Sequence, residues 1–499
     1  MQTAVQASSF SDFLLAAGHA GDTAIIEGPN RYSYAELRAA AGRIVAELGR
    51  LGLAPGSRIG LLANNSLFWV AGYLAAMKSG VVVPFSDKNT VADLTSQAEW
   101  VGCTAVLMDR RSQRRLATAF AGLPVVTDST LGEPGMGEWP DVPTDPQADA
   151  ALMFTSGTTS RPKAVRVSHA NLRANTESIV TYLDLKATDR MAVILPFHYC
   201  FGASLLHTHL AVGGSVALCN TFTFPETAVE LIARESCTGI AGVPSSFQLL
   251  LRASTYATRP LPSLRLVQQS GGRLAPALIQ ELAAAQPGSD LFVMYGQTEA
   301  TARLSFLPPG MLKTKLGSIG RGIPGVQLQV LDEAGRPVAL GVPGEIVASG
   351  DNISPGYFRD PDATAQKFPG GALRTGDLAT VDSDGYIFII GRSGEFIKSW
   401  GHRVSPQQVE EAVLSHPAVA DAAVVGLPDL AAGEAITLAV VPAASASPDP
   451  AELLLFLRDR LPKHMLPHSI HVLQAFPLNA SGKVARPELR RLLEEERAR

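Results

Sequence analysis

This chain of 499 residues contains few cysteines and few aromatic residues, and neither sign of charge is in large excess. Its four cysteines lie far apart and have no metal-ligand spacing, which argues against disulfides and zinc sites and fits reduced thiols in a cytoplasmic protein. The formal net charge of −4 gives no basic footprint for nucleic acid and no polybasic membrane patch. We therefore expect small molecules as partners.

Long uninterrupted apolar runs are missing as well. The most apolar stretch, residues 191–219, is broken by Pro196, three glycines and three histidines, so we expect no membrane span. The first lysine or arginine is Arg31, so we expect the amino terminus to lack the charged region of a secretory signal, and export is not expected. The chain is too long for one compact core, which predicts at least two domains.

Short apolar runs alternate with helical patterns in the first three hundred or so residues. The alternation is typical of βαβ units around a largely parallel sheet, and it occurs in two rounds, up to about residue 130 and from 191 to about 294. Ser33 and Glu36 have the spacing of a capping box, so we expect an amphipathic helix to begin there. Residues 132–149, rich in proline, glycine and acids, predict a surface connection.

The pattern changes after residue 317 to hairpins, with turns at residues 332–335 and 382–385, which indicate a small β unit. Beyond Arg392 a helix begins at Pro406, two apolar strands follow, and a Ser/Pro-rich loop leads into another helix. We predict an α/β fold: a large N-terminal domain of two α/β subdomains plus a small β unit (residues 1–391), and a small α+β C-terminal domain (residues 392–499).

Residues 155–163 hold five hydroxyl side chains, a glycine and a lysine. Apolar runs flank this segment, so we expect it to join two strands and to offer hydroxyls and backbone N–H groups to a nucleotide triphosphate. It is not a Walker A loop, because Pro162 precedes Lys163 and no helix-opening Gly-Lys-Ser/Thr is present. A Ser/Thr-rich turn is the alternative interpretation.

Tyr295, Thr298 and Glu299 follow an apolar strand, at the strand end where open α/β sheets bind ligands. A carboxylate beside a hydroxyl there could hold Mg²⁺, whereas the alternative is a solvated turn. Asp377 could accept hydrogen bonds from both ribose hydroxyls, and Arg392 could add a ribose or phosphate contact. The alternatives are an Asx-type turn for Asp377 and an ordinary hairpin end for Arg392.

Lys483 lies in a glycine-containing stretch near the carboxyl terminus. Most lysines of this kind are merely solvated. A mobile ammonium is nevertheless what a reaction needs when a carboxylate and an α-phosphate must meet despite their mutual repulsion.

Six stretches, taken in order, resemble the adenylate-forming superfamily, which includes acyl- and aryl-CoA synthetases, luciferases and the adenylation domains of nonribosomal peptide synthetases. They are FTSGTTSRPKAV, SGGRLAP, MYGQTEAT, RTGDLATVDSDGYIFIIGR, FIKSWGHRVSPQQVEEAV and NASGKVAR. The resemblance covers nearly the whole chain. It implies that a carboxylate attacks the α-phosphorus of MgATP to give an acyl adenylate and pyrophosphate. The thiol of CoA or of a carrier-protein phosphopantetheine then takes the acyl group.

The resemblance also implies roles for individual residues. Thr298 would contact the α-phosphate, Glu299 would hold Mg²⁺, and Lys483 would bridge the substrate carboxylate and the α-phosphate. The implied pyrophosphate-side grip consists of Thr155, Ser156, Gly157, Thr158, Thr159 and Lys163. The implied adenine and ribose contacts are Tyr295, Asp377, Arg392 and the backbone of Gly271, Gly272 and Arg273. In the family a mobile C-terminal domain withdraws its lysine after adenylation and presents what looks like residues 400–402 to the thiol.

Three positions depart from the family pattern. Ser160 stands where glycine is usual, which predicts a stiffer loop. Gly394 and Glu395 stand where the hinge often carries two acids, which predicts altered populations of the two end states. The segment 198–200 contains no acid where amino-acid-activating relatives carry an aspartate for the substrate ammonium, which points away from α-amino acids.

The substrate pocket implied by the resemblance is mainly apolar and favours an aryl or short-to-medium acyl acid. Its residues are His198, Tyr199, Cys200, Gly202, Val243, Gln269, Ser270 and Met294. We expect the histidines at 198, 207 and 209 to line the core or the pocket rather than to catalyse. The alternatives are an amino-acid-activating adenylation enzyme, a kinase-like NTPase that forms ADP, and a catalytically silent nucleotide-binding protein. The presence of Lys483 and Glu299 argues against the last of these.

Overall fold

The computed structural model describes residues 8–132, 137–155, 163–443, 446–478 and 484–497. Its first sheet is mostly parallel, and three strands joined by two antiparallel pairings form one end. The strands, in spatial order, are β18 (Gly356–Tyr357), β8 (Lys163–Ser168), β7 (Asp149–Thr155), β4 (Val81–Pro84), β3 (Arg58–Leu62), β5 (Cys103–Met108) and β6 (Val125–Thr127). The predicted β segments around residues 60, 82, 106 and 125 are all present.

The second sheet is parallel at its centre and antiparallel at both ends. Its spatial order is β15 (Arg321–Gly322), β14 (Ser305–Leu307), β13 (Asp290–Tyr295), β12 (Leu266–Gln269), β11 (Gly239–Gly242), β9 (Arg190–Val193), β10 (Ser215–Leu218), β1 (Thr23–Glu27) and β2 (Asn30–Ser33). The N-terminal hairpin β1–β2 therefore belongs to this sheet, because β1 pairs in parallel with β10. The sequence pattern did not predict that long-range pairing.

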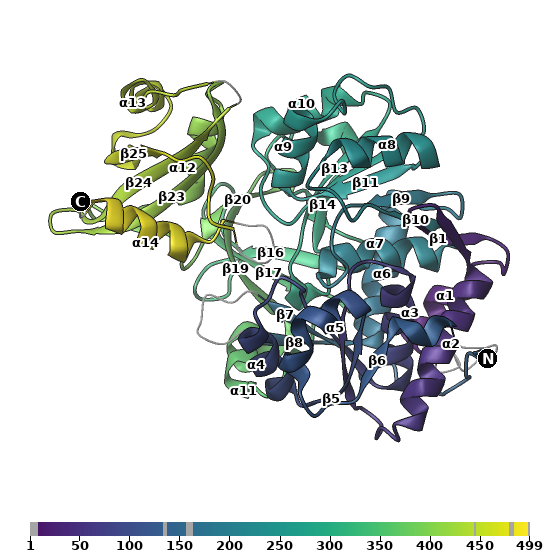
Figure 1. Ribbon diagram of the computed structural model, residues 1–499. Coiled ribbons are helices and arrows are strands. Elements are labelled where there is room, and N and C mark those ends of the chain that lie inside the picture. Colours follow the sequence, from purple (N-terminus) through teal and green to yellow (C-terminus); the bar gives the residue numbers. More distant parts are fainter. Residues whose placement is uncertain (1–7, 133–136, 156–162, 444–445, 479–483, 498–499) are drawn as a thin grey trace.

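Helices pack around both sheets (Figure 1). Helices α3 (Leu67–Ser79) and α7 (Cys200–Ala211) are buried almost all round, as expected for mainly apolar helices. The remaining helices of the N-terminal domain are α1 (Phe10–Ala16), α2 (Tyr34–Arg50), α4 (Val91–Val101), α5 (Arg110–Leu116), α6 (His169–Leu183), α8 (Glu226–Glu235), α9 (Pro244–Ala253), α10 (Pro276–Ala285) and α11 (Pro361–Lys367).

Two local predictions have clear outcomes. Ser33 and Glu36 form both hydrogen bonds of the predicted capping box, and α2 begins at the next residue, Tyr34. The predicted surface connection before residue 149 is partly packed instead. Trp139 lies against the core and its Nε1–H donates to Asp12 Oδ1 over 2.7 Å. The large indole has apolar area to bury, which outweighs the polar composition around it.

The predicted small β unit is an antiparallel sheet with the order β16 (Gln327–Leu331), β17 (Gly344–Ser349), β19 (Leu373–Val381) and β20 (Ile387–Arg392). Beyond it, the C-terminal elements form their own sheet and their own apolar clusters. They are β21 (Ile397–Ser399), β22 (His402–Val404), α12 (Pro406–Leu414), β23 (Val419–Asp429), β24 (Gly433–Pro442), α13 (Pro450–Arg458), β25 (Ser469–Val472) and α14 (Arg486–Arg497).

The predicted fold class is therefore confirmed: a large N-terminal α/β domain and a small C-terminal α+β domain. Figure 1 shows the C-terminal elements gathered on one side, next to β20, and helix α12 contacts that strand. The boundary at residue 391 and the mobility of the C-terminal domain stay predictions. No helix in the described ranges is both long and apolar enough to span a bilayer.

Candidate active site

The two ends of the predicted phosphate loop lie side by side. Thr155 ends β7 and Lys163 begins β8, and the two residues are partners in the antiparallel register. The Lys163 ammonium lies 4.6 Å from the centre of the Tyr357 ring on β18, in the range of a cation–π contact. The other residues predicted to grip the pyrophosphate lie outside the described part of the chain: Ser156, Gly157, Thr158 and Thr159.

Tyr357 connects this strand pair to the predicted metal ligand. Its hydroxyl donates to Glu299 Oε1 over 2.8 Å. Burial and the nearby Glu299 carboxylate raise the pKa of Tyr357, so the phenol stays protonated and remains a donor. Among the described residues Glu299 makes no other side-chain hydrogen bond, which leaves Oε2 for a cation. One carboxylate suits Mg²⁺, because substrate phosphates and waters normally complete its octahedron.

Asp377 is the centre of the predicted ribose site. Its side chain is almost fully buried, and it accepts hydrogen bonds from the Tyr295 hydroxyl and, over 2.9 Å, from Arg392 Nε. Burial and the Asp377 charge raise the pKa of Tyr295 well above its ordinary value. Three residues from β13, β19 and β20 are thus brought together, as the sequence predicted.

Lys367, at the end of α11, is a charged neighbour that sequence reasoning missed. Its ammonium donates to the Thr375 carbonyl over 2.8 Å. Burial lowers the pKa of Lys367, and the carboxylates of Glu299 and Asp377 offset part of that effect. Lys367 therefore supplies positive charge between the predicted metal and ribose residues. A lysine at the end of a short polar helix carries no sequence signal for such a position.

The turn after Glu299 has an unusual backbone. Thr301 has φ = 67°, which is rare for a β-branched residue. The Thr301 hydroxyl donates to the Asn352 carbonyl over 2.7 Å, and Asn352 Nδ2 donates to the carbonyls of Ala300 and Arg303 over 3.2 and 2.9 Å. Asn352, which sequence reasoning also missed, therefore holds the strained turn that carries Thr298 and Glu299.

The glycine pair after β12 has the close packing expected next to a ligand. Gly271 has φ = 80°, and a Cβ there would lie 2.8 Å from Val243 Cγ1. Gln269 Nε2 donates to the Gly272 carbonyl over 2.7 Å. The Arg273 side chain pairs with Glu411 of the C-terminal domain. The predicted nucleotide contact of Arg273 concerns its backbone and not this side chain.

The predicted acyl-pocket residues converge from three elements. Tyr199 and Cys200 lie at the start of α7, and Cys200 Sγ lies 3.5 Å from the hydroxyl of Thr298. A Cβ at Gly202 would lie 2.0 Å from the Pro196 carbonyl oxygen, so only glycine fits there. The strand ends supply the buried members of the set, which are Gln269, Ser270 and Met294.

His198 is a neutral residue in this wall. Burial and the charge of Lys88 lower the pKa of His198 to about 3. Its ring centre lies 4.2 Å from that of Tyr199 with the two rings tilted, and its Nε2 is buried without a hydrogen-bond partner among the described residues. His207 Nε2 contacts the Tyr73 hydroxyl at 3.1 Å, and His209 Nδ1 contacts a helix carbonyl while its Nε2 is, like that of His198, buried without a partner among the described residues. Of these three histidines, His198 is the one in the predicted pocket wall.

The residues predicted to meet the acceptor thiol lie at the tip of the β21–β22 hairpin. Trp400 and Gly401 both have positive φ, 52° and 77°, as in a type I′ turn. The indole is 59% exposed, and its Nε1–H donates to His468 Nε2 over 3.2 Å. His402 stacks on His464 at 4.4 Å. Lys483, the predicted adenylation lysine, lies outside the described residues.

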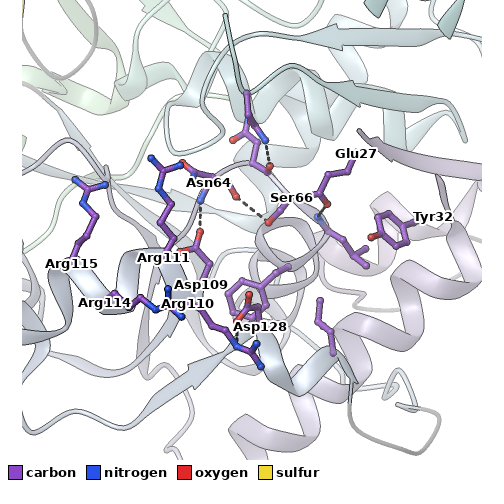
Figure 2. A pocket seen from close by; sticks show the side chains of 15 residues that line it. Glu27, Tyr32, Asn64, Ser66, Asp109, Arg110, Arg111, Arg114, Arg115 and Asp128 are labelled. Carbon is purple, nitrogen blue, oxygen red and sulfur yellow. Dashed lines mark hydrogen bonds and ion pairs between the residues drawn. The ribbon is translucent and has the colours of Figure 1, made fainter. Parts of the chain in front are cut away.

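A separate polar cavity of about 860 Å³ lies where α5 and the end of β3 meet (Figure 2). Figure 2 shows arginines of α5 along one side of it and Asn64 and Ser66 on another. None of the predicted nucleotide or acyl residues lines it. Asn65 in its wall accepts from the Phe197 amide over 2.9 Å, so the cavity adjoins the back of the segment that carries His198.

Comparison with known proteins identifies the family. The AMP-binding enzyme model matches residues 15–358, and the model of the AMP-binding enzyme C-terminal domain matches residues 408–483. A feruloyl-CoA synthase of Amycolatopsis sp is 32% identical over 473 residues, which cover 94% of this chain and 95% of that protein. A 2-succinylbenzoate–CoA ligase of Geobacillus kaustophilus is 30% identical over 479 residues, with 94% and 95% covered.

The fold agrees with solved structures. The o-succinylbenzoate coenzyme A synthetase of Bacillus subtilis, in complex with ATP and magnesium ion, superposes with a TM-score of 0.88 at 27% identity. The match covers 97% of this chain and 99% of that one. Since the AMP-binding model alone spans well over half of the chain and the named relatives match along nearly all of it, the protein belongs to the AMP-binding enzyme family, the adenylate-forming superfamily, and is an adenylate-forming ligase.

Proposed function

We propose that this ligase joins an aryl or short-to-medium-chain carboxylic acid to the thiol of CoA through an acyl adenylate. The observation that carries the proposal is a set of polar side chains in contact at the end of β13. Lys163 contacts Tyr357, which donates to Glu299, and Tyr295 in the same region donates to Asp377. Relatives named as ligases of feruloyl and 2-succinylbenzoyl groups with CoA support both the acid class and the acceptor.

In the first step, a carboxylate oxygen of the acid attacks the α-phosphorus of ATP, and the bond to the bridging oxygen of pyrophosphate breaks. No general base is required, because a carboxylic acid is already ionised at neutral pH. Lys163 and Lys483 are the groups proposed to neutralise the charge that develops on the phosphates, and the Thr298 hydroxyl is proposed to donate a hydrogen bond to the α-phosphate. Glu299 would hold Mg²⁺, which supplies further neutralisation when bound.

In the second step, the thiol sulfur attacks the acyl carbon, AMP leaves, and the thiol proton passes to solvent. The hairpin tip at residues 400–402 is the proposed guide for the pantetheine arm. Withdrawal of Lys483 between the steps would need rotation about the segment near Gly394, where an added side chain would meet no neighbour among the described residues.

The direct test is a panel of carboxylic acids in ATP–pyrophosphate exchange, followed by product analysis with CoA or with a phosphopantetheine-bearing carrier protein as acceptor. We expect AMP, pyrophosphate and an acyl-CoA thioester. Production of ADP, or no AMP with any acid of the panel, would disprove the assignment. Thioester formation on the carrier protein alone would support the ligase activity but show that the acceptor is the carrier protein and not CoA.

The same assay tests the prediction that α-amino acids are poor substrates. The residues at the start of α7, His198, Tyr199 and Cys200, include no carboxylate to pair with a substrate ammonium, and burial of an unpaired ammonium is costly. We expect the rate of ATP–pyrophosphate exchange with proteinogenic amino acids to stay near the background rate that is measured without any added acid. Brisk exchange with any of them would contradict this reading of the pocket.

A further inference from the structure

Arg303, just before β14, is a buried cation that meets no anionic partner in the part of the chain that the structure describes. The residue is 1% exposed, and its guanidinium lies 4.1 Å above the ring of Phe201 on α7. Its Nε approaches Met294 Sδ at 3.4 Å, a weak acceptor, and its buried Nη2 has no hydrogen-bond partner among the described residues. Arginine is almost never fully buried unless it is paired, so this arrangement lacks a counter-charge.

The groups that face the guanidinium cannot provide that charge. Burial lowers the pKa of Arg303, and Tyr182, which also hydrogen-bonds to it, and Cys200 offset part of the effect; neither is a carboxylate. The Tyr182 hydroxyl itself donates to Met294 Sδ over 3.0 Å. A guanidinium stays protonated even under such conditions, so the site keeps a full positive charge.

The position of the cation links it to the acid substrate. Met294 and Cys200 belong to the predicted acyl-pocket wall, and Phe201 lies between Cys200 and Gly202. Cys200 Sγ lies 3.5 Å from Thr298, the predicted α-phosphate contact. The Arg303 carbonyl accepts hydrogen bonds from Asn175 and Asn352, so the backbone that carries the side chain is fixed.

We propose that Arg303 binds a second carboxylate of the acid, so that the preferred substrates are dicarboxylic acids: one carboxylate is adenylated beside Thr298 and the other pairs with Arg303. The inference rests on the proposed function and narrows its substrate class. An arginine–carboxylate pair is charge-assisted and can be bidentate, and it would satisfy the open Nη2. Without the second carboxylate, the enzyme keeps a cation buried at a cost in stability.

The experiment uses matched substrate pairs that differ only in the second charge. Adipate is compared with its monomethyl ester, terephthalate with its monomethyl ester, and shorter and longer aliphatic diacids likewise, with AMP release as the readout. We expect kcat/KM to favour the diacid by at least about tenfold in the best pair, since hydrogen bonds to charged groups are worth roughly ten- to hundredfold. In Arg303→Met that preference disappears because the diacid loses rate, while the monoester keeps its rate.

Arg265→Met is the matched control. Arg265 has a carboxylate partner, since its Nε lies 2.8 Å from the buried Asp189, and it lies at the opposite end of β12 from Gln269. That variant should unfold at a lower temperature, because it leaves the buried Asp189 carboxylate without its partner. It should keep the wild-type substrate preference, because Asp189 is far from the pocket. Arg303→Met should unfold at the wild-type temperature or above, because an apolar side chain replaces an unpaired buried charge.

Two outcomes overturn the inference: no pair in which wild type prefers the diacid, or an Arg303→Met variant that changes both members of a pair equally. If AMP is still formed, either result leaves the proposed ligase function unaffected. Failure of every mono- and dicarboxylic acid to yield AMP would instead defeat the proposed function itself.

Discussion

Glu411 on α12 and Arg273 after β12 form an ion pair between the two domains, and Glu411→Gln should change how the domains dock. The carboxylate Oε1 lies 2.7 Å from Arg273 Nε, and the Glu411 side chain is 21% exposed. Arg273 also donates to the Ile389 carbonyl over 2.9 Å, which fixes it on the N-terminal side. Burial raises the pKa of Glu411 to about 7, although Arg273 opposes the shift, and the like charge of Glu410 adds to it.

The sign of the pH effect follows from that shift. Once the domains separate, Glu411 is solvated and returns toward its ordinary pKa of 4.5. The docked arrangement therefore binds the proton more tightly, and its advantage is complete below about pH 4.5 and is lost as the pH rises through 7. A shift of between two and three pKa units corresponds to roughly 3 kcal/mol, or a few hundredfold in the docking equilibrium.

The assay is resonance energy transfer between a donor dye on one domain and an acceptor on the other, followed from pH 5 to pH 8. The docked fraction of wild type should fall with rising pH. Glu411→Gln, which mimics the protonated acid, should stay docked at pH 8 and lose most of the slope. Glu488→Gln, the same change at an exposed position on α14, is the control and should behave like wild type. A docked fraction that is flat or rises with pH in wild type would refute the reasoning.

Two further predictions concern the chemistry. Lys483→Ala should depress adenylate formation by several orders of magnitude while thioester formation from supplied acyl adenylate continues, so equal losses in both steps would contradict the assigned role. Asp377→Asn should raise KM for ATP about tenfold or more, because a carboxylate that accepts from Tyr295 and Arg392 becomes a neutral amide. KM for the acid should change little, and Asp332→Asn in an exposed turn should alter neither constant.

Local sequence patterns predicted the elements that carry the site because several site residues stand beside short apolar runs. Thr155 and Lys163 are bounded by apolar strands, and their antiparallel pairing follows from the turn composition between them. The predicted hairpin at residues 382–385 brings the strands of Asp377 and Arg392 together, and a register shift between Leu378 and Ala379 then makes the two residues partners. Sequence spacing therefore predicts that they are near each other, but not that they pair.

Residues placed by long-range pairing could not be predicted in this way. Tyr357 reaches Lys163 and Glu299 only because β18 pairs with β8, which lies almost two hundred residues earlier in the chain. Thr23–Glu27 joins the second sheet for the same reason, through β10. Local periodicity specifies that a segment is a strand, but the choice of partner depends on the packing of the whole domain.

Arg303 is buried, although its sequence context favours an exposed side chain, and the strained backbone next to it accounts for the difference. A single arginine between Ala302 and Leu304 would be placed on the solvent face of a strand, because charged side chains are seldom buried. The positive φ of Thr301 turns the chain, and Asn352, far along the sequence, holds that turn through the Arg303 carbonyl. A backbone conformation that costs free energy is retained where the surrounding structure fixes it, and such positions cluster at functional sites. The same turn carries Thr298 and Glu299, so the constraint that orients the proposed phosphate and metal contacts also buries the charge proposed to select the substrate.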